Sequence, residues 1–368
     1  MQDTEYMALA LDLASKGAGR TSPNPMVGAV IVKDGRIIGH GWHKKCGEAH
    51  AERNALASCK EDPKGATMYV TLEPCCHTGK QPPCVDAILE SGISRVVVGS
   101  PDPNPLVAGK GIEILRAHGI KVDTGIYQNE CDRLNEVFLH YIKTKRPFVV
   151  MKYAMTMDGK IASYTGASKW ITGEKARYHV HTLRNKLTAI MVGIGTVLKD
   201  DPMLTCRLEN GRNPIRIICD SNLRTPLSSN IVKTAKEVPT IIATCQKNIS
   251  LHAPYIRSGC TVLVTDSKDE HIDLNNLMDL LGQIEIDSIL LEGGGTLNWA
   301  ALQSGIVCKT MAYIAPKLLG GKDAKTPIEG RGFPKPSMAV NLQNPRVTVI
   351  GDDLLIESEV SGIVHRNS

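Results

Sequence analysis

The hydrophobic and polar pattern of the first 145 residues predicts helices that alternate with short apolar strands. A helical pattern covers residues 4–16. The apolar runs 27–32 and 37–39 are joined around Asp34-Gly35, which predicts a β-hairpin. The remaining elements expected here are helices over 50–57, 84–89, 112–118 and 131–145 and strands over 68–72, 95–99 and 120–122. Such alternation is typical of a layered α/β domain.

A second α/β pattern begins after the basic stretch Lys143–Arg146, where Pro147 precedes a new apolar strand. We therefore expect two domains, residues 1–146 and 147–368. The elements expected in the second are strands over 148–154, 189–193, 215–219, 239–244, 261–265 and 287–291 and helices over 173–184 and 297–303. The halves share no internal repeat, so we expect two different domains.

Composition agrees with this picture, because 368 residues suffice for about two domains with full cores. Hydrophobic residues at 42% and charged residues at 22% are ordinary for a soluble globular protein, and no apolar run is long enough to span a membrane. The acidic start Met1–Glu5 does not resemble a secretory signal. Eleven scattered cysteines favour reduced thiols and a metal site over a disulfide framework. We expect a cytoplasmic protein.

The net charge of +5 is spread along the chain, and only three phenylalanines are present. Single-stranded nucleic-acid binders need basic grooves and aromatic platforms, so this composition disfavours a polynucleotide partner. We expect small-molecule substrates, neither nucleic acid nor membrane as a partner, and a homo-oligomer.

The first candidate site combines His50-Ala51-Glu52 with Cys75 and Cys84. An H-x-E followed by P-C-x-x-C is the signature of zinc-dependent nucleobase deaminases. Here Cys84 lies nine positions after Cys75, with Cys76 and His77 between them. A structural zinc knot or a buried cysteine pair is the alternative. Glu52 favours catalysis, because a structural zinc needs four protein ligands and no free carboxylate, whereas hydrolytic deamination needs a proton shuttle.

The second candidate site is the glycine run 293–295 between an apolar strand and a helix. Backbone N–H groups at such a turn can bind a phosphate, although glycines there also serve close packing. The run matches neither a Walker motif nor G-x-G-x-x-G, which disfavours kinase and Rossmann interpretations.

Several motifs together resemble the bifunctional deaminase/reductase family of riboflavin biosynthesis. They are Ser22–Gly28, Gly41–His43, His50–Glu52, Pro74–Lys80 with Pro82–Cys84, and Met151–Ala162. The resemblance extends from about Tyr6 to Val349. It implies a cytidine-deaminase-like three-layer α/β/α domain followed by a dihydrofolate-reductase-like α/β domain.

For the first domain, the resemblance implies that His50, Cys75 and Cys84 bind one Zn²⁺ ion and that Cys76 does not. Glu52 is then the catalytic proton shuttle, and Asn24 and His77 contact the pyrimidine substrate. Lys80 is a candidate to hold the substrate phosphate.

For the second domain, the resemblance implies two groups of ligand contacts. Those to NADPH are Ala154, Trp170, Thr196, Asp200, Ser221, Gly294, Gly295, Thr296, Leu297, Asn298, Trp299 and Ala300. Those to the ribosyl-phosphate substrate are Lys152, Ser168, Arg184, Leu204, Arg207 and Glu292. The proton donor of the reduction stays open among Lys152, Asp200 and Glu292, each of which is equally well explained as a salt-bridged or hydrogen-bonded anchor.

The expected function is zinc-dependent hydrolytic deamination of 2,5-diamino-6-ribosylamino-4(3H)-pyrimidinone 5′-phosphate. NADPH-dependent reduction of the ribosyl group to ribityl would follow. Two alternatives are a deaminase acting on tRNA or cytidine, and a non-catalytic, zinc-stabilised nucleotide-binding protein.

Overall fold

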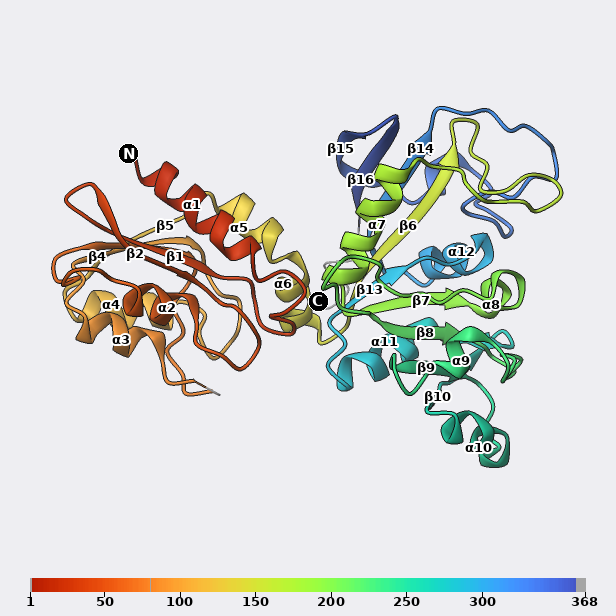
Figure 1. Cartoon of the computed structure of the whole chain (residues 1–368), viewed down its shortest axis with the longest axis horizontal. Coiled ribbons are helices and arrows are strands. Elements are labelled where there is room, and N and C mark those ends of the chain that lie inside the picture. The colour runs from red at the N-terminus through yellow and green to blue at the C-terminus, as the bar shows by residue number, and fades with distance from the viewer. Residues whose placement is uncertain (1, 80, 362–368) are drawn as a thin grey trace. The chain divides into compact units, whose positions relative to one another are not determined.

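The computed structural model describes residues 2–79 and 81–361 and divides the chain into two compact units. The first unit ends at Lys145 and the second begins at Arg146, beside the boundary expected from the sequence (Figure 1). Each unit is built around its own β-sheet.

The first unit contains a five-stranded sheet in the order β2-β1-β3-β4-β5. Strand β1 is antiparallel to both of its neighbours, whereas β3, β4 and β5 are mutually parallel. The strands are β1 (Gly28–Lys33), β2 (Arg36–Trp42), β3 (Thr67–Leu72), β4 (Arg95–Ser100) and β5 (Lys121–Thr124). The helices are α1 (Asp3–Ser15), α2 (Ala51–Ala57), α3 (Cys84–Glu90), α4 (Lys110–Ala117), α5 (Gln128–Leu134) and α6 (Glu136–Thr144).

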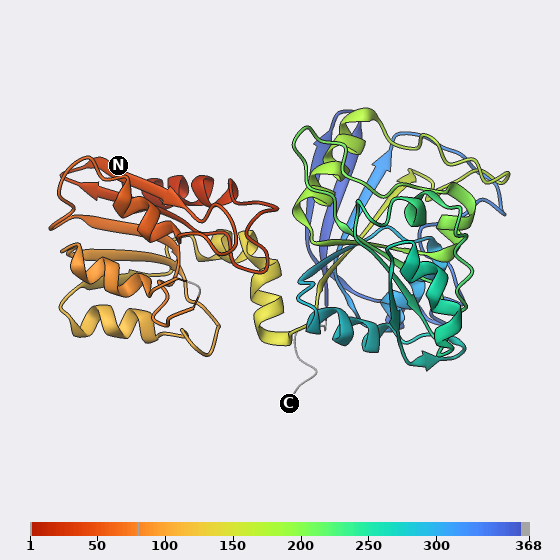
Figure 2. The ribbon, with the colours of Figure 1, turned by 60° about the horizontal axis from the view of Figure 1, so that its bottom comes forward.

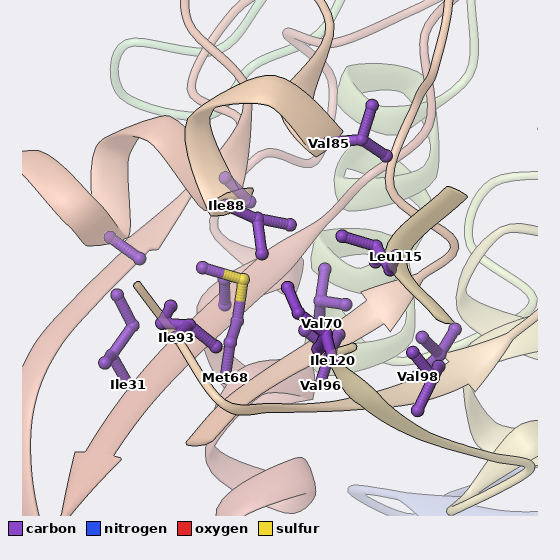
Figure 3. Close-up of a cluster of buried hydrophobic side chains, with 14 of the residues drawn as sticks. Ile31, Met68, Val70, Val85, Ile88, Ile93, Val96, Val98, Leu115 and Ile120 are labelled. Atoms are coloured by element: carbon purple, nitrogen blue, oxygen red, sulfur yellow. The ribbon is translucent and has the colours of Figure 1, made fainter. Parts of the chain in front are cut away.

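Two apolar clusters cover the two faces of this sheet. Helices α2, α3 and α4 share one cluster with the strands, and Figure 3 shows Ile88 and Leu115 reaching toward Met68, Val70 and Val96. Helices α1 and α5 share the other cluster, on the opposite face. The expected three-layer α/β/α arrangement is confirmed.

The helix expected over residues 131–145 is wrong in one respect, because the chain breaks into α5 and α6 at Asn135. Asn135 is almost fully buried and its side chain is bonded to the backbone of Met26: Oδ1 accepts from the Met26 N–H at 2.8 Å, and Nδ2 donates to the Met26 carbonyl at 2.9 Å. A long-range bond of this kind has no local sequence signal. It fixes the segment that leads into β1.

The second unit contains a nine-stranded sheet in the order β10-β9-β8-β7-β13-β6-β14-β16-β15. The sheet is parallel from β10 to β14 and antiparallel from β14 to β15. Its strands are β6 (Phe148–Thr156), β7 (Ala189–Gly193), β8 (Ile215–Cys219), β9 (Thr240–Thr244), β10 (Thr261–Val264), β13 (Ser288–Leu291), β14 (Val307–Ala315), β15 (Leu342–Ile350) and β16 (Asp353–Val360). A separate hairpin joins β11 (Ser267–Lys268) to β12 (His271–Ile272).

The α-helices of the second unit cover both faces of the sheet. They are α7 (Glu174–Lys186), α8 (Ile194–Asp200), α9 (Asn230–Lys233), α10 (Ile249–Arg257), α11 (Leu274–Gln283) and α12 (Gly295–Gln303), with a short 3-10 helix at Pro336–Met338. The apolar cluster of one face contains α11 and α12, and that of the other contains α8, α9 and α10 (Figure 2). The helices α8 to α11 and the strands β11, β12 and β14 to β16 were not expected from the sequence. Short length explains this for α9, β11 and β12, and exposure explains it for β15.

Among the described residues, no helix combines the length and the apolar character that crossing a membrane requires.

We predict that Asn135→Ala lowers the free energy of opening of the first unit by about 2 kcal/mol, because it leaves a buried N–H and a carbonyl of Met26 without partners. Hydrogen–deuterium exchange of the β1 and β3 amides measures this unit by itself. The matched control is Asn129→Ala on the exposed surface of α5. Equal exchange in the two variants would contradict a bridging role for Asn135.

Candidate active site

In the first unit, three metal-ligating side chains converge from three different element ends. His50 directly precedes α2, Cys75 follows the end of β3, and Cys84 is the first residue of α3. Their ligand atoms all lie within 4.8 Å of one another. His50 Nδ1 is 3.5 Å from Cys75 Sγ and 3.4 Å from Cys84 Sγ.

This geometry fits a zinc ion. Zn–N and Zn–S bonds of about 2.0–2.1 and 2.3 Å at a tetrahedral angle put nitrogen and sulfur about 3.6 Å apart, close to the distances found here. A set of one imidazole and two thiolates leaves the fourth position open, as in catalytic zinc sites. Among the described residues, no fourth His, Cys, Asp or Glu belongs to the group.

Glu52 lies in the first turn of α2, two residues after His50. Its side chain is only 3% exposed. Burial, together with the neighbouring Cys75 thiolate, raises the pKa of Glu52 to about 7. A carboxyl group with a pKa near neutrality can both accept and release a proton.

The two cysteines differ in their electrostatic surroundings. A hydrogen bond from Cys84 and the nearby His50 lower the pKa of Cys75 to about 4, against the opposing effect of burial. The backbone N–H of Cys84 also points to Cys75 Sγ at 3.4 Å. The Cys84 thiol has a raised pKa, because it shares its proton with Cys75 and is buried. The start of α3 thus stabilises the thiolate that a metal would require.

Cys76 lies apart from this trio, since its thiol is directed to the carbonyl of Leu106 at 3.5 Å. Asn24 Nδ2 is 3.4 Å from His43 Nε2, and His43 Nδ1 is 3.1 Å from the Ala49 carbonyl. Donation by Nδ1 to that carbonyl leaves Nε2 as an acceptor for the Asn24 amide. The His43 ring stands edge-on to the His50 ring, with centroids 5.3 Å apart. His43 is thus a site residue that sequence reasoning quoted in a motif without assigning a role.

His77 presents a buried Nδ1 that has no hydrogen-bond partner within the described part of the chain. A buried polar atom without a partner usually awaits a ligand or a water. Lys80 lies outside the described residues.

In the second unit, a buried cluster of charges joins Lys152, Arg184 and Glu292. Arg184 Nε and Nη2 donate to the two carboxylate oxygens of Glu292 at 2.8 and 3.0 Å, and Lys152 Nζ lies 3.7 Å from Glu292 Oε2. Burial would raise the pKa of Glu292, but the two cations outweigh it and lower the pKa to about 2. Burial lowers the pKa of Lys152. In this cluster Glu292 therefore stays ionised, whereas burial makes the charged form of Lys152 less favourable.

Strand alternation explains this placement. On β6, Val149 and Met151 face the cluster that contains α11 and α12, so Lys152 faces the other side of the sheet. Glu292 follows Leu291 of β13 and falls on the same side as Lys152 by the same alternation. Arg184 reaches both from the last turn of α7.

Two further residues of this cluster were missed by sequence reasoning. Lys152 Nζ lies over the ring of the fully buried Tyr313, 5.8 Å from its centroid. The Tyr313 hydroxyl lies 2.7 Å from His179 Nδ1 on α7. Strand β14 was not expected, so no sequence signal could place Tyr313 beside Lys152.

Several hydrogen bonds tie the loop after α8 to α7, two of them at predicted substrate residues. Arg184 Nη1 donates to the Thr205 carbonyl at 3.0 Å, and the Arg207 N–H donates to His181 Nδ1 at 3.2 Å. Leu204, in this loop, is buried with a positive φ of 52°. The predicted substrate residues Lys152, Arg184, Leu204, Arg207 and Glu292 are thus gathered around α7.

A cavity of about 570 Å³ lies at the edge of the sheet where β7, β8 and β13 end. Figure 1 shows α8 and α12 at this edge. A Cβ on Gly195 would meet nothing within 4 Å, whereas one on Gly295 would lie 2.5 Å from Glu329 Cγ. Within the run 293–295, a Cβ on Gly294 would have no neighbour nearer than Thr196 Oγ1 at 4.0 Å, so this run combines close packing at Gly295 with an open border at Gly294.

Most residues expected to contact NADPH line this cavity. They are Thr196, Asp200, Ser221, Gly294, Gly295, Thr296, Leu297 and Ala300, together with Ser168 from the expected substrate set. Ala154, Trp170, Asn298 and Trp299 are not among its lining residues. Asn298 Nδ2 donates to the Pro327 carbonyl, and the Trp299 ring packs edge-on to Phe333. Trp170 is 60% exposed and stacks against the Arg177 guanidinium.

Comparison with known families separates the same two halves. The family described as the RibD C-terminal domain matches residues 147–356. The family described as the cytidine and deoxycytidylate deaminase zinc-binding region matches residues 1–100.

Known proteins resemble the chain over nearly its whole length. Riboflavin biosynthesis protein RibD of Actinobacillus pleuropneumoniae is 54% identical, over 97% of this chain and 95% of that protein. RibD of Escherichia coli is 42% identical, over 97% of this chain and 99% of its own length. The crystal structure of a diaminohydroxyphosphoribosylaminopyrimidine deaminase/5-amino-6-(5-phosphoribosylamino)uracil reductase from Thermotoga maritima aligns with a TM-score of 0.88 at 40% identity, covering 97% of this chain and 98% of that one. The expected fold of both domains is confirmed.

We predict that the protein purified with zinc holds close to one ion per chain, and that Cys75→Ser removes most of it. Cys76→Ser is the matched control on the adjacent residue, and it should leave the zinc content unchanged, because its thiol faces Leu106. Metal analysis by mass spectrometry measures both variants. Equal losses of zinc would overturn the choice of ligands.

Proposed function

Because the chain belongs to the riboflavin biosynthesis protein RibD family, we propose that the two sites of this chain are a deaminase site in residues 1–146 and a reductase site in residues 147–368. The enzyme is bifunctional, with a zinc-dependent deaminase and an NADPH-dependent reductase. It removes the 2-amino group of 2,5-diamino-6-ribosylamino-4(3H)-pyrimidinone 5′-phosphate by hydrolysis. It then reduces the ribosyl group of the product to ribityl. Family membership thereby excludes the non-catalytic alternative.

In the deaminase, His50, Cys75 and Cys84 hold zinc, which supplies the Lewis acidity that activates water. The observation that carries this proposal is the convergence of the three ligand atoms beside the buried Glu52. Glu52 takes a proton from the attacking water and delivers one to the departing ammonia. Asn24, oriented by His43, and His77, with its free buried nitrogen, hold the pyrimidine ring by hydrogen bonds.

In the reductase, NADPH supplies the hydride, and the protein positions the sugar against it. Arg184 and Arg207 are suited to the substrate phosphate, since guanidinium groups pair with phosphate in a bidentate manner. Glu292 fixes Arg184 through two parallel hydrogen bonds. Lys152, held between Glu292 and Tyr313, is the group best placed to give a proton, because burial has already lowered its pKa. Leu204 and Ser168 are proposed as further substrate contacts, and Ser168 lines the adjoining cavity.

The remaining contacts to NADPH follow the cavity at the edge of the sheet. Thr196, Asp200, Ser221, Gly294 and the α12 residues Gly295, Thr296, Leu297 and Ala300 line it. Asn298 and Trp299, also on α12, are proposed as contacts beside it. Ala154 and Trp170 would contact the cofactor from β6 and from the loop after it. All eleven cysteines are free thiols, which supports a reducing compartment such as the cytoplasm.

An assay of the purified enzyme with the diaminopyrimidine phosphate tests the proposal. We expect ammonia release without NADPH, followed by NADPH oxidation once the cofactor is added. Glu52→Gln should keep zinc and lower the rate of ammonia release at least a hundredfold, while the variant still oxidises NADPH when given the deaminated intermediate. Loss of zinc from this variant would make Glu52 a ligand, and deamination with no NADPH oxidation would overturn the reductase assignment.

We further propose that the enzyme forms a homo-oligomer through β15. This strand is at the edge of the sheet and pairs with β16 alone within the described residues. Val347 and Val349 on it are 63% and 69% exposed. An exposed apolar edge strand is a template for pairing with another chain, which natural proteins leave open mainly where a partner covers it.

We predict that replacing both Val347 and Val349 with Lys converts the oligomer to a monomer, because two buried charges would oppose pairing. Light scattering coupled to size-exclusion chromatography measures the mass. The control Ile249→Lys replaces an apolar residue that is 76% exposed, at the start of α10. A monomeric parent enzyme, or a double variant of unchanged mass, would refute the interface.

A further inference from the structure

The loop that follows β8 brings an arginine to the wall of the cavity. Arg224 lines the cavity together with Ser221 and Asn222 of the same loop. Its side chain is exposed, and its guanidinium makes no hydrogen bond or ion pair to any of the residues that the structure describes. A guanidinium with all its donors free is suited to an anion.

Sheet order shows which part of a dinucleotide would reach this loop. The strands at the cavity run β8-β7-β13-β6. The charged cluster of Lys152 and Glu292, where the sugar substrate is held, belongs to β6 and the end of β13. The open glycine backbone at Gly195 and Gly294 lies at the ends of β7 and β13. A cofactor with its nicotinamide at β6 and its pyrophosphate at these glycines must place its adenosine at β8.

The carboxylate at the end of β8 is buried and does not line the cavity, although its Oδ1 has no hydrogen-bond partner among the described residues. Asp220 directly follows β8 and is fully buried. Its Oδ2 accepts from the Thr225 N–H and hydroxyl, both at 2.7 Å, inside its own turn. In Rossmann-type sites, a free carboxylate on the ribose hydroxyls favours NADH and an arginine near the added phosphate favours NADPH. The same charge complementarity applies to a ribose phosphate in any fold. The loop after β8 presents the arginine.

Two other cations line the cavity away from the loop after β8. Lys325 pairs with Glu329 at 3.3 Å. Lys199 is directed to the loop after β6, where a Cβ on Gly166 would lie 3.0 Å from its Nζ. Of the lysines and arginines that line the cavity, Arg224 is the one on the loop after β8.

We propose that Arg224 binds the phosphate on the adenosine ribose of NADPH and thereby sets the preference of the reductase for NADPH over NADH. The inference rests on the proposed function, in which this cavity holds the cofactor, and it assigns a specificity-determining residue within it.

Calorimetric titration with NADPH, NADH, 2′,5′-ADP and 5′-ADP tests the proposal without turnover. The parent enzyme should bind NADPH more tightly than NADH, and 2′,5′-ADP more tightly than 5′-ADP. Arg224→Gln should weaken binding of NADPH and 2′,5′-ADP about ten- to a hundredfold and leave NADH and 5′-ADP within about twofold, as expected for loss of one charge-assisted pair. Lys199→Gln is the control for removal of a cation from the same wall, and Arg224→Lys should retain part of the preference.

An Arg224→Gln variant that keeps the full preference, or a Lys199→Gln variant that alone loses it, would overturn the role of Arg224 while leaving the reductase assignment intact. A parent enzyme that binds neither NADPH nor NADH would overturn both. Melting temperatures equal to that of the parent enzyme show that a loss of binding is local.

Discussion

Parallel pairing constrains both units, because it places the carboxyl ends of neighbouring strands at one edge of a sheet. In the first unit, this edge carries Cys75 after β3 and the starts of α2 and α3, which bring His50 and Cys84. In the second, it carries the ends of β6, β7, β8 and β13. Residues distant in sequence meet there because each follows a strand of the same direction. Two unrelated chemistries thus use the same structural device.

The buried carboxylates of the two candidate sites have pKa values shifted in opposite directions. Glu52 is buried beside a thiolate, and its pKa rises toward neutrality, which suits a group that moves protons. Glu292 is buried between Arg184 and Lys152, and its pKa falls to about 2, which suits a group that stays charged and holds others in place. The neighbouring charges, more than the extent of burial, decide which role a buried carboxylate takes.

The sequence predicts most elements of the first unit within a few residues, because the strands there are short, apolar and bounded by turns. The convergence of His50, Cys75 and Cys84 was also predictable, since ligand chemistry leaves a local signature around these residues. Contacts between segments distant in the sequence could not be predicted. The bonds from Asn135 to Met26 and the approach of Tyr313 to Lys152 join segments more than a hundred residues apart. Strands such as β15, exposed on both faces, lack the alternation that identifies a strand. The residue roles carried over by resemblance stay predictions.

Strand β13 lies between β6 and β7 in the sheet but follows both of them in the sequence, which affects folding during synthesis of the chain. Strand β6 starts at Phe148, and its partners within the described part of the chain are β13 and β14, which start at Ser288 and Val307. At about 5–20 residues per second, a ribosome needs on the order of ten seconds to make the intervening stretch. During that time the apolar strand β6 has no partner strand. By contrast, β1 and β2 are adjacent in sequence and can pair once both have left the ribosome. Nascent chains of this enzyme therefore expose their aggregation-prone segment in the reductase half.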